Sequence, residues 1–338
     1  MVKAQIVADK NGLHYQAPGP HIDRSVTLRF QGDWGGANFH RVCGWLSQEF
    51  CDRSGPYSRV FIGNSNGQAD TVRAVHRGRA DLAITTPTTA VEMMVRGEGL
   101  AQGEPCSDLR ALAVIPQRDI LVLALGKEFG IETFEELRRK RPALKIATSP
   151  DDGMNYLGYI ARRFMEAAGI PEETLKSWGG SYVDAMRPEI VLEFFREGLV
   201  DGVIMEAIMA PWWRQLVEKR EIVFLSAPEE TLQLMERQYH WARKVMHANT
   251  FPNQPEDVWT IDYSHFVVFC RDDLPEDIAH LLTWCLVETR DLIEVQYRHL
   301  APDRSPITYP LEPKKMAQTP LPLHPGAERY YREAGLLA

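Results

Sequence analysis

The sequence lacks the common motifs of nucleotide-binding proteins and hydrolases. It contains no Gly-x-Gly-x-x-Gly after its first expected strand, no Gly-x-x-x-x-Gly-Lys-Ser/Thr, no Gly-x-Ser-x-Gly and no His-Glu-x-x-His. Phosphate loops, serine nucleophile elbows and zinc-protease helices each depend on one of these spacings. His240 and His247 lie apart from any cysteine pair, so we expect no metal site and no cofactor.

Positive charge and long apolar runs are also scarce. The net charge of −8 argues against nucleic acid as a partner, because such surfaces need a basic stripe. The apolar run 120–125 is far shorter than the ~20 residues that span a bilayer, so we expect no direct membrane insertion. With 44% apolar and 25% charged residues in 338, the composition is typical of a globular protein of two domains.

Cysteine is scarce, and its number is odd. The five residues lack metal-type spacing and suit free thiols in a reducing compartment. They are Cys43, Cys51, Cys106, Cys270 and Cys285. The first ten residues contain no apolar segment of the secretory type. We therefore expect a cytoplasmic protein; the alternative is a periplasmic one whose signal peptide has been removed.

Strand-like and helix-like runs alternate along the chain, which predicts an α/β fold with parallel-rich sheets flanked by helices. The expected strands are 26–31, 58–63, 80–85, 110–115, 119–125, 144–148, 200–205, 221–225 and 263–270. The expected helices are 37–50, 66–77, 88–95, 133–139, 154–168, 182–197, 208–218, 229–238, 275–297 and 326–334.

Four loops that follow expected strands carry short polar side chains, and two of them also contain glycine. In open α/β sheets, ligands bind beyond the carboxyl ends of strands, where helix N-termini present unpaired N–H groups. Simple helix capping explains each loop equally well. The candidate ligand-binding residues in the four loops are Trp34, Gly35, Gly36, Asn38, Asn64, Ser65, Asn66, Thr85, Thr86, Ser149, Asp152, Gly153 and Asn155.

Further candidates lie near other strand ends and chain crossings. Arg118 suits two-point binding of a carboxylate, although a surface arginine is the alternative. Glu206 follows an expected strand, and Trp213 supplies either a cleft wall or core. Tyr182 follows a glycine turn in the middle of the chain.

Asp151 and Asp152 are adjacent acids at the start of an expected helix, where they favour the helix dipole but repel an anion. One carboxylate is enough to cap the helix that follows, so we expect Asp152 to face a cleft while Asp151 caps or meets solvent. Capping by both is the alternative. If the protein is an enzyme, which remains open, Asp33, Asp152 and Glu206 are its acid and base candidates.

Two segments carry a family resemblance. Pro322-Leu-His-Pro-Gly-Ala327 precedes Tyr330-Tyr-Arg-Glu333, and Arg77-Gly-Arg-Ala-Asp-Leu-Ala-Ile84 follows an expected helix. Both resemble TAXI-type solute receptors, the binding proteins of one class of TRAP transporters.

The resemblance implies a two-lobed periplasmic-binding-protein-like fold of type II. Lobe 1 would comprise 1–118 and 271–338, with an N-terminal extension, 1–24, and a docking helix, 325–335. Lobe 2 would be 119–270. The implied function is hinged binding of a small carboxylate or amino-acid-like solute, with a TRAP-type membrane permease as partner. The alternative is a cytosolic enzyme on the same scaffold, such as a small aromatic-acid decarboxylase or another lyase.

Overall fold

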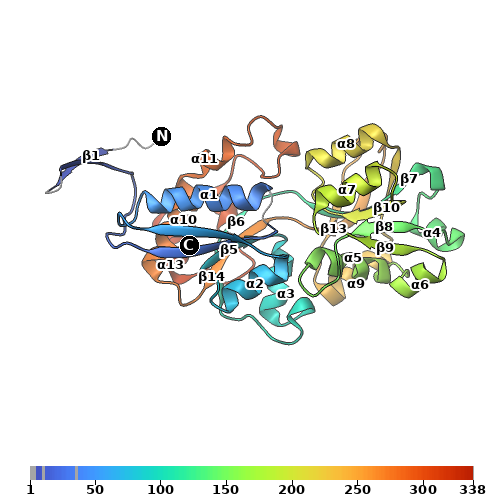
Figure 1. Ribbon diagram of the computed structural model, residues 1–338, viewed down its shortest axis with the longest axis horizontal. Coiled ribbons are helices and arrows are strands. Elements are labelled where there is room, and N and C mark those ends of the chain that lie inside the picture. The colour runs from blue at the N-terminus through green and yellow to red at the C-terminus, as the bar shows by residue number, and fades with distance from the viewer. Residues whose placement is uncertain (1–4, 10–11, 35–36, 338) are drawn as a thin grey trace.

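A computed structural model of the chain shows two mixed β-sheets, each covered by helices, in two lobes that lie side by side (Figure 1). The structure describes residues 5–9, 12–34 and 37–337. The expected two-lobed α/β fold is therefore confirmed.

The sheet of lobe 1 has five strands in the order β4-β3-β5-β14-β6. Their bounds are β3 Thr27–Gly32, β4 Arg59–Asn64, β5 Leu82–Thr85, β6 Leu109–Ile115 and β14 Phe266–Arg271. Alternate residues of the strands join two different cores: Phe30 packs with the helices on one face, and Ala83 with those on the other. Such alternation follows from the two-residue period of a strand.

Helices cover both faces of this sheet (Figure 1). One face carries α1 Ala37–Cys51, α10 Glu276–Glu288, α11 Arg290–Glu294, α12 Pro313–Met316 and α13 Pro325–Glu333. The other carries α2 Gln68–His76, α3 Thr88–Arg96 and the short η1 Gly99–Ala101. Helix α13 begins at Pro325. The His324 side chain caps this helix by accepting a hydrogen bond from the N–H of Gly326.

The sheet of lobe 2 has seven strands, ordered β12-β13-β7-β10-β8-β9, with β11 paired to β7 beside β13. Their bounds are β7 Ile120–Gly126, β8 Lys145–Thr148, β9 Ser181–Asp184, β10 Gly202–Met205, β11 Ile222–Leu225, β12 Arg243–Met246 and β13 Val258–Asp262. The helices of this lobe are α4 Phe134–Lys140, α5 Tyr156–Ala167, α6 Glu172–Ser177, α7 Pro188–Arg196, α8 Pro211–Lys219 and α9 Glu229–Tyr239.

Parallel pairing is less common than we expected. Four of the ten strand pairings in the two sheets are parallel: β3 with β4, β3 with β5, β8 with β9 and β8 with β10. The antiparallel pairings involve the strands next to the crossings, since β14 returns from lobe 2 and enters between β5 and β6. A strand that arrives from the far lobe runs against its new neighbours.

Two short segments connect the lobes, residues 116–119 and residues 263–265. The second crossing lies before the expected boundary at 270. Residues 266–270 belong to β14 and pair with strands of lobe 1, so their assignment to lobe 2 was wrong. Five of the six residues of β14 are buried, so its sequence is a continuous apolar run. Such a run does not indicate which of the two sheets the strand joins.

Residues 182–184 were expected to begin a helix but form the end of β9, with α7 starting only at Pro188. Near the N-terminus, β1 Gln5–Asp9 pairs antiparallel with β2 Gly12–Gln16, in a hairpin beyond lobe 1 (Figure 1). No helix among the described residues combines the length and the hydropathy needed to cross a membrane.

Candidate functional site

A cavity of about 220 Å³ lies between the lobes, beside the crossings. Lobe 1 contributes the loop after β3, the start of α1 and the segment after α11, including Trp34, Asn38 and Tyr297. Lobe 2 contributes the loop after β10, from Glu206 to Trp212. Elements distant in sequence therefore meet at the carboxyl ends of strands, where α/β folds place ligands.

Aromatic rings form much of the cavity wall. Trp34 meets Phe39 edge to face at 5.8 Å between ring centroids, and Phe39 meets Phe266 at 5.4 Å. Trp212 lines the cavity from lobe 2. These rings give an apolar surface and an ordered shape, since edge-to-face pairs have a preferred geometry.

Two acidic side chains, Asp119 and Glu206, line the cavity and are almost fully buried, with exposed fractions of 2% and 8%. Asp119 lies on the first crossing, and its carboxylate accepts hydrogen bonds from the backbone N–H groups of Ala207 (3.0 Å) and Ile208 (3.1 Å). It thereby fixes the turn after β10, where Ala207 takes a positive φ of 64°.

The two carboxyl groups are hydrogen-bonded to each other. Burial raises the pKa of Asp119 to about 6, although the Glu206 hydrogen bond and backbone N–H groups oppose this shift. Burial, the charge of Asp119 and the shared hydrogen bond all raise the pKa of Glu206 well above its ordinary value. Glu206 is therefore the proton donor of the pair, and the two groups together carry one proton near neutral pH.

A third buried acid, Asp33, lies at the end of β3 close enough to raise the pKa of Glu206 further. Its Oδ2 accepts a hydrogen bond from Thr85 Oγ1 at 2.6 Å. Burial raises the pKa of Asp33 to about 7, against the hydrogen bond from Thr85.

Two buried polar atoms near these acids have no hydrogen-bond partner among the described residues: Asp33 Oδ1 and the hydroxyl of Tyr263. Tyr263 lies on the second crossing, and burial with the charges of Glu206 and Asp33 raises its pKa well above its ordinary value. Buried polar atoms without partners are uncommon and require an explanation, such as a missing water, ion or ligand.

Basic side chains line the opposite, solvent-facing part of the cavity. The Arg41 guanidinium stacks over the Tyr297 ring, 5.4 Å from its centroid. The Tyr297 hydroxyl donates to Asn38 Oδ1 at 2.5 Å. His299 also lines the cavity. Arg41 and His299 are both exposed, so water screens their charges more than those of the buried acids.

The crossings that support the site are hydrogen-bonded to each other. The carbonyl oxygen of Asp119 accepts from the N–H of Tyr263 (3.0 Å) and from Ser264 Oγ (3.1 Å). Gln117 Nε2 donates to Thr86 Oγ1, which donates to the carbonyl oxygen of His265. This network connects both crossings to the end of β5.

Several residues expected from the sequence lie at this site. Trp34, Asn38, Thr86 and Glu206 line the cavity. Asp33 and Thr85 lie beneath it and are fully buried. Gly35 and Gly36 are outside the described residues.

The loop after β8 does not line this cavity, and the expected role of Asp152 is not supported. Its Oδ1 accepts hydrogen bonds from the N–H groups of Met154 and Asn155 in the turn before α5, so Asp152, rather than Asp151, satisfies local backbone groups. Asp151 forms an ion pair with Arg163. A carboxylate two or three residues before a helix reaches these N–H groups readily.

The remaining loop candidates do not line the cavity either. Ser65 Oγ hydrogen-bonds to Thr71 Oγ1 and Gly67 O at the start of α2. The other residues with no place in the cavity wall are Asn64, Asn66, Ser149, Gly153 and Asn155.

Three further candidates do not line this cavity, and for Arg118 and Trp213 the structure agrees with the alternatives of a surface residue and a core residue. Arg118 is exposed and lines a separate groove with Lys244 and His247. Tyr182 lies under the guanidinium of Arg162, 4.6 Å away, on β9. Trp213 is fully buried in the core of lobe 2, where its Nε1 donates to the backbone oxygen of Glu206 at 2.9 Å; the neighbouring Trp212 lines the cavity instead.

Sequence reasoning missed Asp119, Gln117, Arg41, Tyr297 and His299. The first two lie in a crossing that was recognised, and an acid at the start of an apolar strand was the available signal. Tyr297 and His299 follow α11 and reach the site only through tertiary packing.

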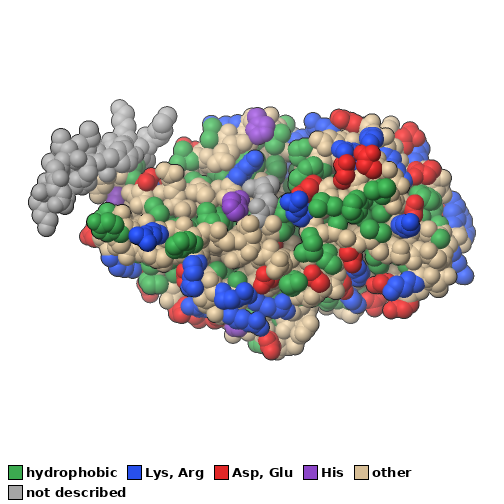
Figure 2. Space-filling view, viewed as in Figure 1, with side chains coloured by type: hydrophobic (Ala, Val, Ile, Leu, Met, Phe, Trp, Pro, Cys, Tyr) green, Lys and Arg blue, Asp and Glu red, His purple; other side chains and the backbone are tan. Residues whose placement is uncertain are grey.

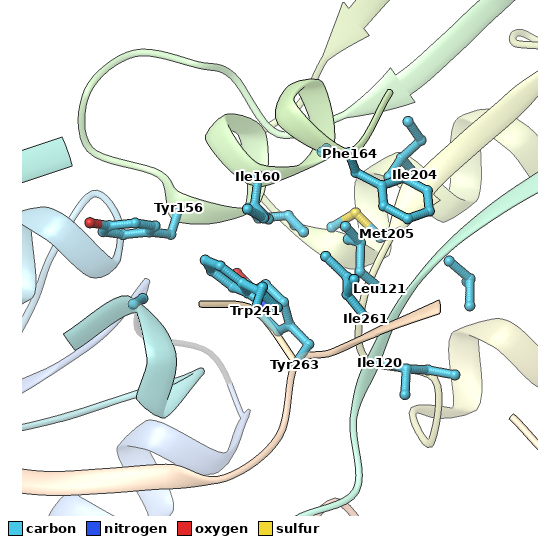
Figure 3. Packing of buried hydrophobic residues seen from close by; sticks show 14 of the residues in the cluster. Ile120, Leu121, Tyr156, Ile160, Phe164, Ile204, Met205, Trp241, Ile261 and Tyr263 are labelled. Carbon is cyan, nitrogen blue, oxygen red and sulfur yellow. The ribbon is translucent and has the colours of Figure 1, made fainter. Parts of the chain in front are cut away.

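A second interlobe contact closes the opposite side of the lobes. Tyr156, the first residue of α5, points from lobe 2 toward lobe 1, away from Ile160 and Phe164 of its own helix (Figure 3). Its hydroxyl accepts from the N–H of Leu100 at 3.2 Å. Arg73 Nη1 of α2 donates to the carbonyl oxygen of Gly153 at 2.8 Å. The hydrophobic core is continuous across this contact.

The exposed face in Figure 2 carries acidic and basic side chains interspersed over both lobes. Within the described part of the chain, no group of three His, Cys, Asp or Glu side chains is arranged to hold a metal ion.

Comparison with known proteins agrees with this architecture. The model of the NMT1-like family matches residues 57–335. The chain belongs to the NMT1-like family. This match includes both crossings and most of both lobes.

Solved structures similar to this family member show the same fold. A periplasmic transporter has a TM-score of 0.53 at 13% identity, covering 92% of this chain and 95% of its own. A protein from Bordetella bronchiseptica RB50 has a TM-score of 0.51 at 12% identity, with 92% and 98% covered. XAC2383 from Xanthomonas citri, bound to ATP, has a TM-score of 0.50 at 13% identity, with 92% and 97% covered. At such identities the likeness establishes the two-lobed fold alone.

Proposed function

We propose that this protein binds a small polar organic solute in the cavity between its lobes. The observation that carries the proposal is the cavity itself, which combines aromatic walls, including Trp34 and Phe266, with two buried carboxyl groups at the hinge. Ligand sites are typically concave, mostly apolar and equipped with a few placed polar groups.

The position of the cavity supports a hinged binding mechanism. Residues of both lobes and of the first crossing line it, so a solute held there contacts both lobes at once. A ligand that binds the closed form better than the open form shifts the population toward closure. The fold of similar structures, including a periplasmic transporter, is consistent with this mechanism.

The resemblance of the tail and of the segment 77–84 to TAXI-type receptors supports an amino-acid-like or carboxylate solute and a TRAP-type permease as partner. Membership of the NMT1-like family is compatible with this assignment without specifying it. A cytoplasmic location also remains a prediction, and cell fractionation of the native protein would test it.

The enzyme alternative has less support. Its acid and base candidates are Asp33, Asp152 and Glu206, and of these Asp152 bonds to the backbone of the loop before α5 and does not line the cavity. Residues 152–155 contact α2 of lobe 1 instead.

A thermal-shift screen tests the proposal with a panel of amino acids, amines and carboxylates. A ligand at a hundred times its Kd stabilises the folded protein by about 2.7 kcal/mol, which gives a measurable rise in Tm. Ala210 lines the cavity with backbone angles that suit any L-residue, so Ala210→Leu fills part of it. Ala334 is exposed at the end of α13, and Ala334→Leu is the matched control.

We expect a stabilising ligand whose effect is lost in Ala210→Leu and kept in Ala334→Leu. A ligand that stabilises all three proteins equally binds elsewhere and would contradict the proposal.

A further inference from the structure

We propose that the solute carries a cationic nitrogen, a primary ammonium group, which binds between the carboxyl groups of Glu206 and Asp119. This inference rests on the proposed function and specifies the chemical class of its ligand. It excludes simple carboxylates that lack an amine.

The argument begins with the depth of the charged groups. Glu206 and Asp119 are almost fully buried where they line the cavity, whereas Arg41 and His299 are exposed on it. Charges in a low-dielectric environment act more strongly than charges that water surrounds. A bound solute therefore meets a negative field at the buried end of the cavity.

The geometry also leaves acceptor capacity for a donor to use. A carboxylate accepts about four hydrogen bonds. Asp119 uses its oxygens for the N–H groups of Ile120, Ala207 and Ile208 and for Glu206. The side chain of Glu206 has only that one partner among the described residues, and it faces the cavity.

A second observation points to a missing donor. Asp33 Oδ1 is fully buried behind the cavity wall and accepts no hydrogen bond from any described residue, and the buried hydroxyl of Tyr263, which also lies outside the cavity lining, is likewise without a partner. Both groups interact electrostatically with Glu206. An ammonium group has three donors and a positive charge, and it would offset the cost of burying acidic groups here.

The walls suit such a ligand. The Trp34, Phe39, Phe266 and Trp212 side chains surround the cavity with ring faces and edges, which favour cations on their faces and accept apolar chains. A carboxylate in the same position would lie against buried acids. Like charges at this depth repel, so the cavity should discriminate by the sign of the ligand.

Binding of the ammonium group releases one proton from the protein. In the free protein Glu206 donates its proton to a hydrogen bond with Asp119. In the complex the N–H groups of the ammonium take that place, Glu206 is ionised, and its proton passes to solvent. No bond of the solute forms or breaks.

Two sets of probes of matched shape test the inference at pH 7.5 by isothermal titration calorimetry. The first is 3-methylbutylamine, leucine and 4-methylpentanoate. The second is benzylamine, phenylalanine and phenylacetate. We expect the amine-bearing probes of at least one set to bind at least ten times more tightly than the carboxylate of that set.

Variants of Glu206 and Asp119 test whether these two residues cause the preference for amines. Glu206→Gln retains a donor to Asp119 but cannot ionise, so the amine preference should fall at least tenfold. Asp119→Asn is a second variant for the same purpose, with circular dichroism to confirm its fold. Glu166→Gln removes an exposed acid of lobe 2, which pairs with Arg163 outside the cavity, and should bind as the parent does.

Three results overturn the inference. They are carboxylates that bind as tightly as the amines, an amine preference that survives in Glu206→Gln, and no binding by any amine-bearing probe. The Ala210→Leu experiment judges the proposed function separately. A carboxylate whose binding Ala210→Leu abolishes would contradict the ammonium site while supporting a binding cavity.

Discussion

Glu206 donates a hydrogen bond to Asp119 at the junction of lobe 2 and the first crossing. Asp119 in turn accepts from the N–H groups of Ala207 and Ile208 in the turn that carries Glu206. One acid thus positions the backbone, and its neighbour faces the cavity with a proton.

The first prediction separates these two roles. Asp119→Ala removes the acceptor of three backbone N–H groups, those of Ile120, Ala207 and Ile208, and should lower the free energy of unfolding by about 1–3 kcal/mol for each group that is left unpaired. Glu206→Gln retains a donor to Asp119 and should change that free energy by less than about 1 kcal/mol. Urea unfolding followed by circular dichroism measures both.

Asp23 is exposed, so Asp23→Ala is the control for loss of an aspartate. If Asp119→Ala unfolds at the urea midpoint of the parent, its backbone contacts contribute no net stability and the prediction is wrong.

The second prediction concerns Asp33 and the pH dependence of stability. Burial raises its pKa from 3.8 to about 7, so the folded state binds the proton more tightly than the unfolded state does. The free energy of unfolding should therefore fall as pH rises from about 4 to about 7, by up to roughly 4 kcal/mol from this group. Asp33→Asn has no charge to bury, so it should lose less stability over that range.

Urea unfolding at pH 5 and pH 8 checks this, with Asp23→Asn as the matched control. Equal pH dependence in the parent and in Asp33→Asn would show that Asp33 does not carry the effect.

The third prediction follows from the proton released on ammonium binding. Affinity for benzylamine should rise about tenfold for each pH unit between pH 5.5 and pH 8, because binding releases one proton from Glu206, whose pKa is raised well above its ordinary value. A site that is neutral at low pH attracts a cation less. The charged and titratable groups that face Glu206 or line the cavity are Asp33, Arg41, Asp119, Glu189, Tyr263 and His299.

Calorimetry in two buffers of different ionisation enthalpy measures directly how many protons are released on binding. His299→Gln removes the titratable group at the rim and should leave the pH profile unchanged, whereas Glu206→Gln should flatten it. If the affinity does not change across this pH range, binding is not linked to a proton and the prediction is wrong.

The fourth prediction distinguishes two adjacent tryptophans. Trp213→Ala removes a fully buried ring and its hydrogen bond to the Glu206 carbonyl, and should cost about 3–5 kcal/mol of stability. Trp212→Ala should change stability by less than about 1 kcal/mol and weaken solute binding about tenfold, because its ring lines the cavity. Thermal unfolding and calorimetry on both variants provide the test. Weak binding by a stable Trp213→Ala, with Trp212→Ala like the parent, would reverse the assignment.

Much of the fold could be predicted from the sequence, because alternating strand and helix periods are local signals. The position of β14 could not, since its apolar residues fit the core of either lobe. The edge strands β9 and β12 were missed because they are only partly buried, so their residues lack the apolar run that identified the equally short β8 and β10.

The site was harder to predict for a physical reason. Asp33 and Glu206 follow strands, and strand ends converge in this fold, so their position was predictable. Asp119 becomes buried only when the turn after β10 packs against the crossing. Asp151 and Asp152 are chemically identical neighbours, and only the backbone path decides which one reaches the N–H groups of the turn before α5.

The Tyr156 contact restricts how the lobes can separate. Opening on that side would bring a fully buried ring into water, at a cost of about 1.5–3 kcal/mol, and would break the bond between Arg73 and Gly153. On the opposite side, the cavity already separates the residues of the two lobes. The rotation of the lobes that costs the least free energy therefore has its pivot near Tyr156. A solute enters and leaves past Trp212 and Leu300, on one side of the molecule only.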